Sequence, residues 1–186
     1  MTDSFDRWFA SYLDQDKLQV ARLLKDRTAT RFLITWSIFE SDCFGGFVQF
    51  KEINDYSKKI VEKSDFKREK FAEALRYFHN RYQEPQLYKN LMHKQKSPEL
   101  KQILEKDIGI LTPSEEIFFL VAVVYRYRNN IFHGNKGISS WLQFRKQIDL
   151  CRNIMQELID IAETTHNKAI NFAREKLGPD ALMRAG

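Results

Sequence analysis

The chain has 186 residues, of which 43% are hydrophobic, 30% charged and 13% aromatic, and its formal net charge is +5. This length suits a single domain with a core of its own, and we expect residues 1–186 to form one. Only seven glycines and four prolines interrupt the chain, which favours helices over many short strands. The basic charge is compatible with nucleic acid as a partner but does not establish one.

Three local features of the sequence bear on the cellular location of the protein. The opening residues, MTDSFDRW, include acidic residues and no apolar run, so they predict no signal peptide. The nine apolar residues from Ile117 to Tyr125 are too few for a membrane span, which needs about 20. Cys43 and Cys151 lie far apart, without the spacing of a zinc site or a disulfide framework. We therefore expect a cytoplasmic protein that contacts no membrane and holds no metal or cofactor.

The chain begins with two predicted helices. The first is short and amphipathic, because aromatic residues recur at helical spacing, and we expect its aromatic stripe to pack into the core. The stripe consists of Phe5, Trp8, Phe9 and Tyr12. The second helix is expected from about Asp16 to Phe44, where a glycine pair at 45–46 ends or interrupts it.

Residues from about 47 to 108 are expected to form a helical elaboration between the early helices and a later central helix. The first part, to Lys70, keeps a helical pattern with many basic residues, but acidic residues are interspersed. This favours an ordinary solvated face over a track for RNA phosphates. Residues 71–82 carry an inward stripe, residues 85–96 predict a loop or short helix that could close over a site, and Ser97 begins another short helix.

The central helix is predicted from about Pro113 to His133. Thr112 and Glu115 have the spacing of a capping box, Pro113 suits the first helical position, and Gly134 would end the helix. Apolar residues surround its first two turns almost completely, which is typical of a buried helix. One more long helix follows, with an apolar face from Phe144 to Ala162 and a possible extension to Lys176.

The end of the central helix carries the candidate functional residues. Arg128 falls within the apolar arc and needs a partner there, because burying an unpaired charge is costly. Asn129 and His133 are four residues apart and share a face. Arg128 and His133 diverge by about 140° on an ideal helix. Both could reach one ligand in a cleft at the helix edge, or in one shared between two copies.

This segment, Arg128-Asn129-Asn130-Ile131-Phe132-His133, resembles the R-x4-6-H motif of the HEPN superfamily, including the polar residue that commonly follows the arginine. The resemblance is specific over residues 128–134, and the helical layout agrees with it along much of the chain. It implies an all-α, HEPN-like helical bundle with a helical insertion before the motif helix. It also implies a homodimer formed through that helix, and a metal-independent ribonuclease acting as a toxin or phage-defence effector, with RNA as substrate and an antitoxin as a possible protein partner.

The residue types fit this chemistry. His133 could act as general base on the 2′-OH or as acid for the leaving 5′-oxygen, Arg128 could hold phosphoryl oxygens, and Asn129 could hold His133 or the phosphate. Attack by the 2′-OH would leave 2′,3′-cyclic phosphate ends. Glu40 and Asn130 are possible supporting residues. For Glu40, which is four residues after Trp36, exposure in the last helical turn is favoured over neutralising Arg128 or orienting His133.

Two other interpretations remain. The chain could be a non-catalytic HEPN-like module that binds RNA, a nucleotide or a protein partner. Alternatively, the motif could be an ordinary helix end, in which the histidine interacts with the helix dipole and Gly134 provides a left-handed cap.

Overall fold

The computed structural model describes residues 4–14, 17–132 and 143–177, and it confirms the all-α class, since this part of the chain contains no strand. The α-helices are α1 (Ser4–Leu13), α2 (Lys17–Lys25), α3 (Thr28–Phe44), α4 (Ile53–Val61), α5 (Ala72–Tyr82), α6 (Pro85–Met92), α7 (Pro98–Glu105), α8 (Pro113–Phe132) and α9 (Arg145–Leu177). Three 3-10 turns accompany them: η1 (Phe50–Glu52), η2 (Arg68–Phe71) and η3 (Ile108–Ile110).

Helix α8 is the centre of the fold, as its apolar sequence predicts. Every residue from Ile117 to Val124 is buried, with at most 5% of its surface exposed. The predicted capping box is present: the Glu115 N–H donates to Thr112 Oγ1 at 3.3 Å, and the Thr112 N–H donates to Glu115 Oε2 at 2.9 Å. These bonds satisfy N–H groups that a helix start otherwise leaves without partners.

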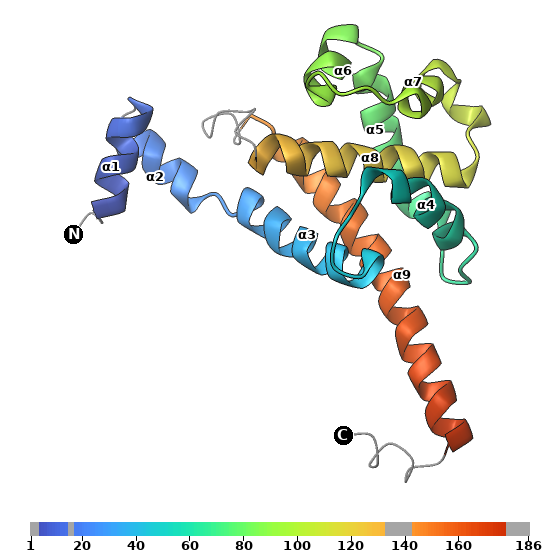
Figure 1. Ribbon diagram of the computed structural model, residues 1–186. Helices are drawn as coiled ribbons and strands as arrows, with labels where there is room; N and C mark the ends of the chain where they lie inside the picture. The colour runs from blue at the N-terminus through green and yellow to red at the C-terminus, as the bar shows by residue number, and fades with distance from the viewer. Residues whose placement is uncertain (1–3, 15–16, 133–142, 178–186) are drawn as a thin grey trace.

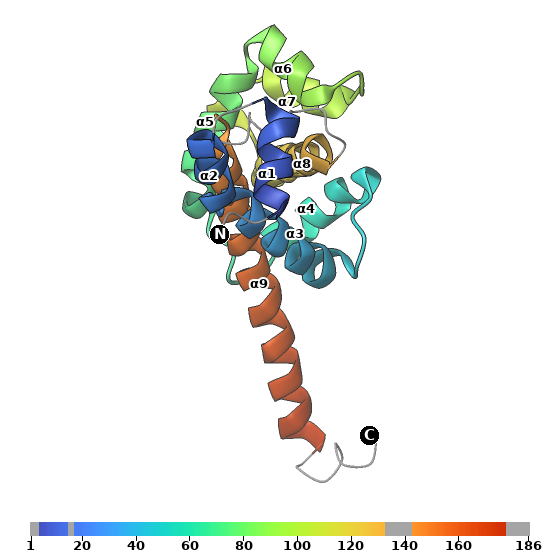
Figure 2. The same ribbon diagram turned by 90° about the vertical axis from the view of Figure 1, so that its left-hand side faces the viewer.

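The other helices enclose α8 on several sides (Figure 1). Helices α4, α5, α6 and α7 all contact it, and α9 packs against both α8 and α3. The inward stripe expected over residues 71–82 is confirmed, since Phe71, Leu75, Phe78 and Tyr82 are buried in the same core. Both views show the C-terminal half of α9 projecting beyond the other helices (Figures 1 and 2). No helix in the described ranges is long and apolar enough to cross a membrane.

The segment predicted as one second helix forms two helices, α2 and α3, because the helix is interrupted at Asp26 and Arg27. Asp26 Oδ1 accepts the Thr28 N–H at 2.7 Å, and the same carboxylate forms an ion pair with Arg145 at the start of α9. A carboxylate that accepts the N–H of the first residue of a helix favours a new helix start over a continuous helix. The predicted end is correct: Gly45 adopts a left-handed φ of 71°, and its N–H donates to the Ser41 carbonyl at 3.0 Å.

The prediction that the first aromatic stripe packs into the core is wrong. Of the four residues only Phe9 is buried, whereas Phe5, Trp8 and Tyr12 are 49%, 58% and 68% exposed. Helix α1 packs against α2 and forms with it a small apolar cluster separate from the main core. The α1–α2 pair stands to one side of the bundle (Figure 1). The exposed rings stack on one another instead, with Trp8 and Tyr12 centroids 5.5 Å apart.

The continuous helical pattern expected up to Lys70 is also interrupted. Helix α4 ends at Val61, and a turn leads to η2 before α5 begins. Two of the basic residues here are held in ion pairs with later helices. Arg68 donates to Glu116 on α8 and to the Leu111 carbonyl, and Lys70 Nζ lies 2.5 Å from Glu157 on α9. Arg68 and Lys70 therefore fasten this segment to the bundle.

Candidate functional site

The C-terminal end of α8 places Arg128 and Asn129 side by side. Arg128 Nη1 donates to Asn129 Oδ1 at 3.0 Å, and both residues are half-buried. The guanidinium of Arg128 also lies over the indole of Trp36 on α3, 5.6 Å from the ring centroid. A cation over an indole face is attracted by the electrons of the ring. The arginine is thus held from two sides at the edge of the core.

Glu40 fixes the indole that lies beneath Arg128. Its Oε2 accepts the Trp36 Nε1–H at 2.9 Å, and its Oε1 accepts the Val48 N–H at 3.0 Å. The favoured exposure of Glu40 is therefore wrong, because the reversal after α3 brings the backbone at Val48 back onto the carboxylate and half-buries it. Asp42, two residues later, is exposed. Glu40 acts on Arg128 through Trp36.

Asn130 faces a different element from Asn129. It is 3% exposed, and its Nδ2 donates to the Leu91 carbonyl at 3.1 Å, near the C-terminal end of α6. Carbonyls in the last turn of a helix have no partner within the helix, so this bond fastens α6 to α8. The structure therefore brings Arg128 and Asn129 together and directs Asn130 to a packing contact.

His133, the proposed acid or base, and Gly134 lie outside the described residues. The described part of the site is therefore made of Arg128 and Asn129 on α8, together with Trp36 and Glu40 on α3. Trp36 and Glu40 are four residues apart on α3, and this helical spacing predicts that their side chains are in contact. No local signal marks the contact of Trp36 with α8, because it depends on how α3 and α8 pack.

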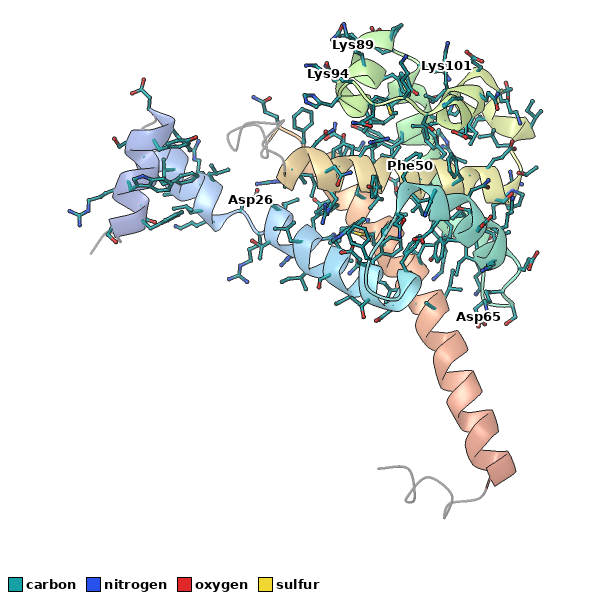
Figure 3. The ribbon with its side chains drawn as sticks, in the orientation of Figure 1. Asp26, Phe50, Asp65, Lys89, Lys94 and Lys101 are labelled. Atoms are coloured by element: carbon teal, nitrogen blue, oxygen red, sulfur yellow. The ribbon has the colours of Figure 1, made fainter. Side chains whose placement is uncertain are left out.

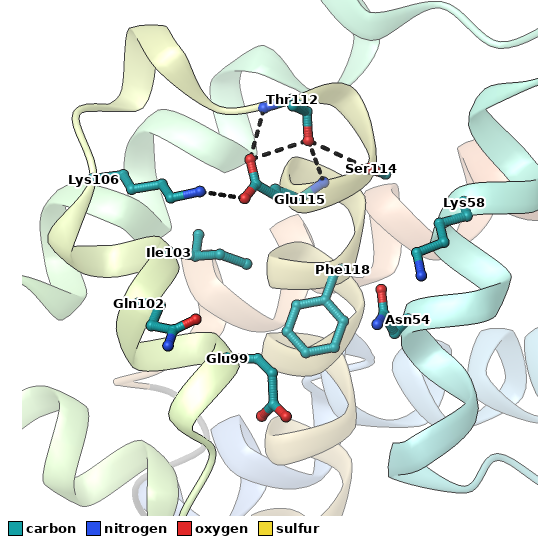
Figure 4. A pocket seen from close by; sticks show the side chains of 10 residues that line it. All are labelled: Asn54, Lys58, Glu99, Gln102, Ile103, Lys106, Thr112, Ser114, Glu115 and Phe118. Carbon is teal, nitrogen blue, oxygen red and sulfur yellow. Dashed lines mark hydrogen bonds and ion pairs between the residues drawn. The ribbon is translucent and has the colours of Figure 1, made fainter.

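A hollow of about 340 Å³ lies at the other end of α8, between α4 and α7 (Figure 4). Asn54 and Lys58 line one side, Glu99 and Gln102 line the other, and Phe118 stands between them. The helix start is already occupied, since Glu115 binds Thr112 and Lys106 there. Arg128 is 14 residues beyond Ser114, or about 21 Å along a straight helix, so the motif residues do not line this hollow.

Within the described ranges, no group of three or more His, Cys, Asp and Glu side chains is placed to hold a metal ion. In comparisons with known proteins, no family model, no curated protein and no solved structure matches the chain. The assignment of a function therefore depends on the geometry around α8 and on the resemblance of residues 128–133 to the HEPN motif.

Proposed function

We propose that this protein is a metal-independent endoribonuclease of HEPN type, which cleaves RNA through attack of the 2′-OH and leaves 2′,3′-cyclic phosphate ends. The observation that carries the proposal is the position of Arg128. Its guanidinium is held by Trp36 and Asn129 at the end of α8, in the same segment of sequence as His133.

Each residue has a role that follows from its chemistry. Arg128 provides a planar, permanently charged group for the phosphoryl oxygens, where negative charge develops during the reaction. A histidine imidazole can gain or lose a proton near neutral pH, so His133 is assigned the exchange of the proton of the 2′-OH or of the leaving 5′-oxygen. Asn129 orients Arg128 or contacts the phosphate. Glu40 is a positioning residue, because it binds the indole on which Arg128 lies.

The reaction needs two proton transfers, and each chain offers one His133. A homodimer that pairs two copies of α8 would bring two such histidines to one RNA strand. This assembly belongs to the proposal, as do the role of toxin or phage-defence effector, the cytoplasmic location and a partner antitoxin. Measuring the mass of the protein in solution tests the dimer independently of cleavage.

The test is a ribonuclease assay in excess EDTA with end-group analysis of the products. We expect the wild-type protein to leave 2′,3′-cyclic phosphates, and both His133→Ala and Arg128→Ala to lose at least about 100-fold in rate, which is the scale of one general acid–base or oxyanion contact. Arg76→Ala is the matched control, because Arg76 is exposed on α5. Full cleavage by a folded His133→Ala protein would exclude this mechanism.

The second candidate is a non-catalytic helical module that binds RNA, a nucleotide or a protein. The observation that favours it is the engagement of Arg128 by Asn129 and Trp36, since both contacts are also those of a structural arginine. A folded wild-type protein that binds a panel of RNAs in an Arg128-dependent way, yet cleaves none of them, would support the module.

A further inference from the structure

A second arginine on α8, Arg126, is buried without an anionic partner. Only 8% of its surface is exposed, and its Nε is sealed from solvent with no acceptor. In the part of the chain that the structure describes, its guanidinium forms no hydrogen bond or ion pair. By contrast, Arg68 binds the carboxylate of Glu116 and Arg145 that of Asp26. Removing a cation from water costs several kcal/mol, so buried cations normally have such a partner.

The surroundings of Arg126 are aromatic and do not supply the missing charge. Its guanidinium carbon lies 4.8 Å from the centroid of Phe50 and 5.8 Å from that of Tyr125. Figure 3 shows Phe50 beside the middle of α8. Such contacts contribute roughly 0.5–2 kcal/mol each, but they bring no negative charge and so do not replace an anionic partner. Burial accordingly lowers the pKa of Arg126, although an arginine remains charged at neutral pH.

Tyr88, on the helix α6 that packs against α8, adds a second hydrogen-bond donor on this side of the bundle. Burial raises the pKa of Tyr88, while the positive charge of Arg126 acts in the opposite direction, so the phenol remains protonated at neutral pH. Its hydroxyl, too, forms no hydrogen bond within the described ranges. The next residue, Lys89, is exposed on the outer side of α6 (Figure 3). In the described ranges, the Arg126 guanidinium on α8 and the Tyr88 hydroxyl on α6 therefore bind no protein acceptor.

We propose that Arg126 and Tyr88 bind a phosphate group carried by a nucleotide or an RNA strand, with Phe50 as the aromatic wall of the site. Arginine N–H groups fit two oxygens of a phosphate at once. In this proposal the phenol of Tyr88, on the neighbouring helix, donates to a third oxygen. A phosphate has three or more acceptor oxygens in a tetrahedral arrangement, so it can accept hydrogen bonds from donors on both helices. Half-buried aromatic rings beside the anion suit a base or sugar attached to it.

This site is distinct from that of Arg128. Residues two apart on a helix point about 200° from one another, so Arg126 and Arg128 leave α8 on opposite sides. Arg126 lies against Phe50, whereas Arg128 lies over Trp36. The proposal therefore holds whether or not the protein cleaves RNA, and phosphate binding should survive Arg128→Ala.

The first experiment measures thermal unfolding with inorganic phosphate against chloride at equal ionic strength. Phosphate stabilises most proteins slightly by exclusion from their surface, so the comparison is between variants. We expect a rise in Tm that is lost in Arg126→Met, reduced in Tyr88→Phe and retained in Arg76→Met, an exposed arginine on α5. An equal rise in wild type and Arg126→Met would overturn the proposal.

The phosphate-free protein provides an independent measurement. Arg126→Met removes an uncompensated cation and keeps an unbranched side chain, so we expect Tm to be unchanged or higher than that of wild type. A large loss of Tm would instead show that Arg126 is bound by the protein itself, and would contradict the proposal. Tyr88→Phe repeats the phosphate test in a variant that retains the ring and its packing.

Calorimetric titration with uridine monophosphate and with a short single-stranded RNA identifies the source of the phosphate. We expect at least one of the two to bind, with an affinity about tenfold lower in Arg126→Met, equivalent to about 1.4 kcal/mol. A loss of affinity for the RNA alone would assign the site to an RNA strand. A loss of affinity for the monophosphate alone would assign it to a free nucleotide. Equal binding of both by Arg126→Met and wild type would contradict the proposal.

Discussion

The guanidinium of Arg128 lies over the indole of Trp36, 5.6 Å from its ring centroid, and links the end of α8 to the middle of α3. Trp36 is itself fixed by the carboxylate of Glu40, which also binds the Val48 N–H. The position of the motif arginine thus depends on a carboxylate on another helix. Under the proposed function, this carboxylate would affect RNA cleavage through Trp36 and Arg128, without contact with the RNA.

We expect Glu40→Ala to destabilise the protein and to weaken the function of Arg128. The change leaves the Trp36 and Val48 N–H groups without their acceptor, which costs roughly 1–3 kcal/mol for a buried group. Urea denaturation would show the loss of free energy, and RNA cleavage or binding would show the functional loss. Asp42→Ala, at an exposed carboxylate on the same helix, should change neither quantity by much. Equal effects of the two variants would refute the role given to Glu40.

We expect substitutions of Asn129 and Asn130 to affect different properties, RNA cleavage or binding for Asn129 and stability for Asn130. Asn130→Ala removes the donor to the Leu91 carbonyl between α8 and α6, and we expect a loss of about 1–3 kcal/mol in unfolding free energy. Asn129→Ala removes the contact with Arg128 and should lower RNA cleavage or binding more than stability. Urea denaturation and the RNA assay would be run on both variants. If Asn129→Ala mainly lowered stability and Asn130→Ala mainly lowered RNA cleavage or binding, the roles given to the two residues would be wrong.

Arg68→Ala should be more damaging than its exposure suggests. Its partner Glu116 has only 5% of its side chain exposed, so the change leaves a carboxylate buried without a cation. We expect a loss of about 2 kcal/mol, less than for a fully buried pair because half of Arg68 is in solvent. Lys70→Ala, which breaks the more exposed pair with Glu157, should cost clearly less in the same denaturation experiment.

Stability should fall in acid partly through the start of α8. The hydrogen bond from Lys106, together with those from Thr112, holds the pKa of Glu115 below its ordinary value. A carboxyl with a lowered pKa in the folded state contributes stability above its unfolded pKa, near 4.3, and loses it as the pH falls through the folded value. Urea denaturation at pH 6 and pH 3 should show a smaller drop for Glu115→Gln than for wild type.

The α1–α2 pair should open independently of the bundle. Its own apolar cluster is small, with Phe9, Val20 and Leu23 as the buried members, and its contacts are mainly internal. We expect amide hydrogens of α1 and α2 to exchange through local opening, and those of Ile117 to Val124 to exchange only on global unfolding. Hydrogen exchange followed by mass spectrometry measures both. Equal protection of the two regions would show that the pair is fastened more strongly than these contacts indicate.

Local signals in the sequence predict much of this fold. The start of α8 follows from Thr112, Pro113 and Glu115, and the end of α3 from the glycines at 45–46, because such signals act within a few residues. Local signals do not predict how deeply a helix is buried, because burial depends on which other elements pack against each face of the helix. The aromatic repeat of α1 has the same period whether or not another element covers it, so the sequence could not predict its exposure.

The candidate site shows the same division. The helical spacing predicts that Asn129 shares a face with His133, whereas its contact with Arg128 is seen only in the structure. The contact between Arg128 and Trp36 depends on the packing of α3 against the bundle, and the burial of Glu40 depends on a chain reversal. The sequence does not predict the interruption at Asp26 and Arg27, because neither glycine nor proline marks it and the only signal is a carboxylate that accepts the Thr28 N–H.

The central place of α8 has a consequence for synthesis on the ribosome. Helices α4 to α7 leave the exit tunnel before α8, which covers their inward faces. Side chains such as Ile60, Phe78 and Leu100 therefore remain exposed to water until α8 emerges. The bundle can close only after α8 has itself left the exit tunnel. A nascent chain of this kind exposes apolar surface for seconds, at elongation rates of about 5–20 residues per second, and is a natural client for chaperones at the ribosome.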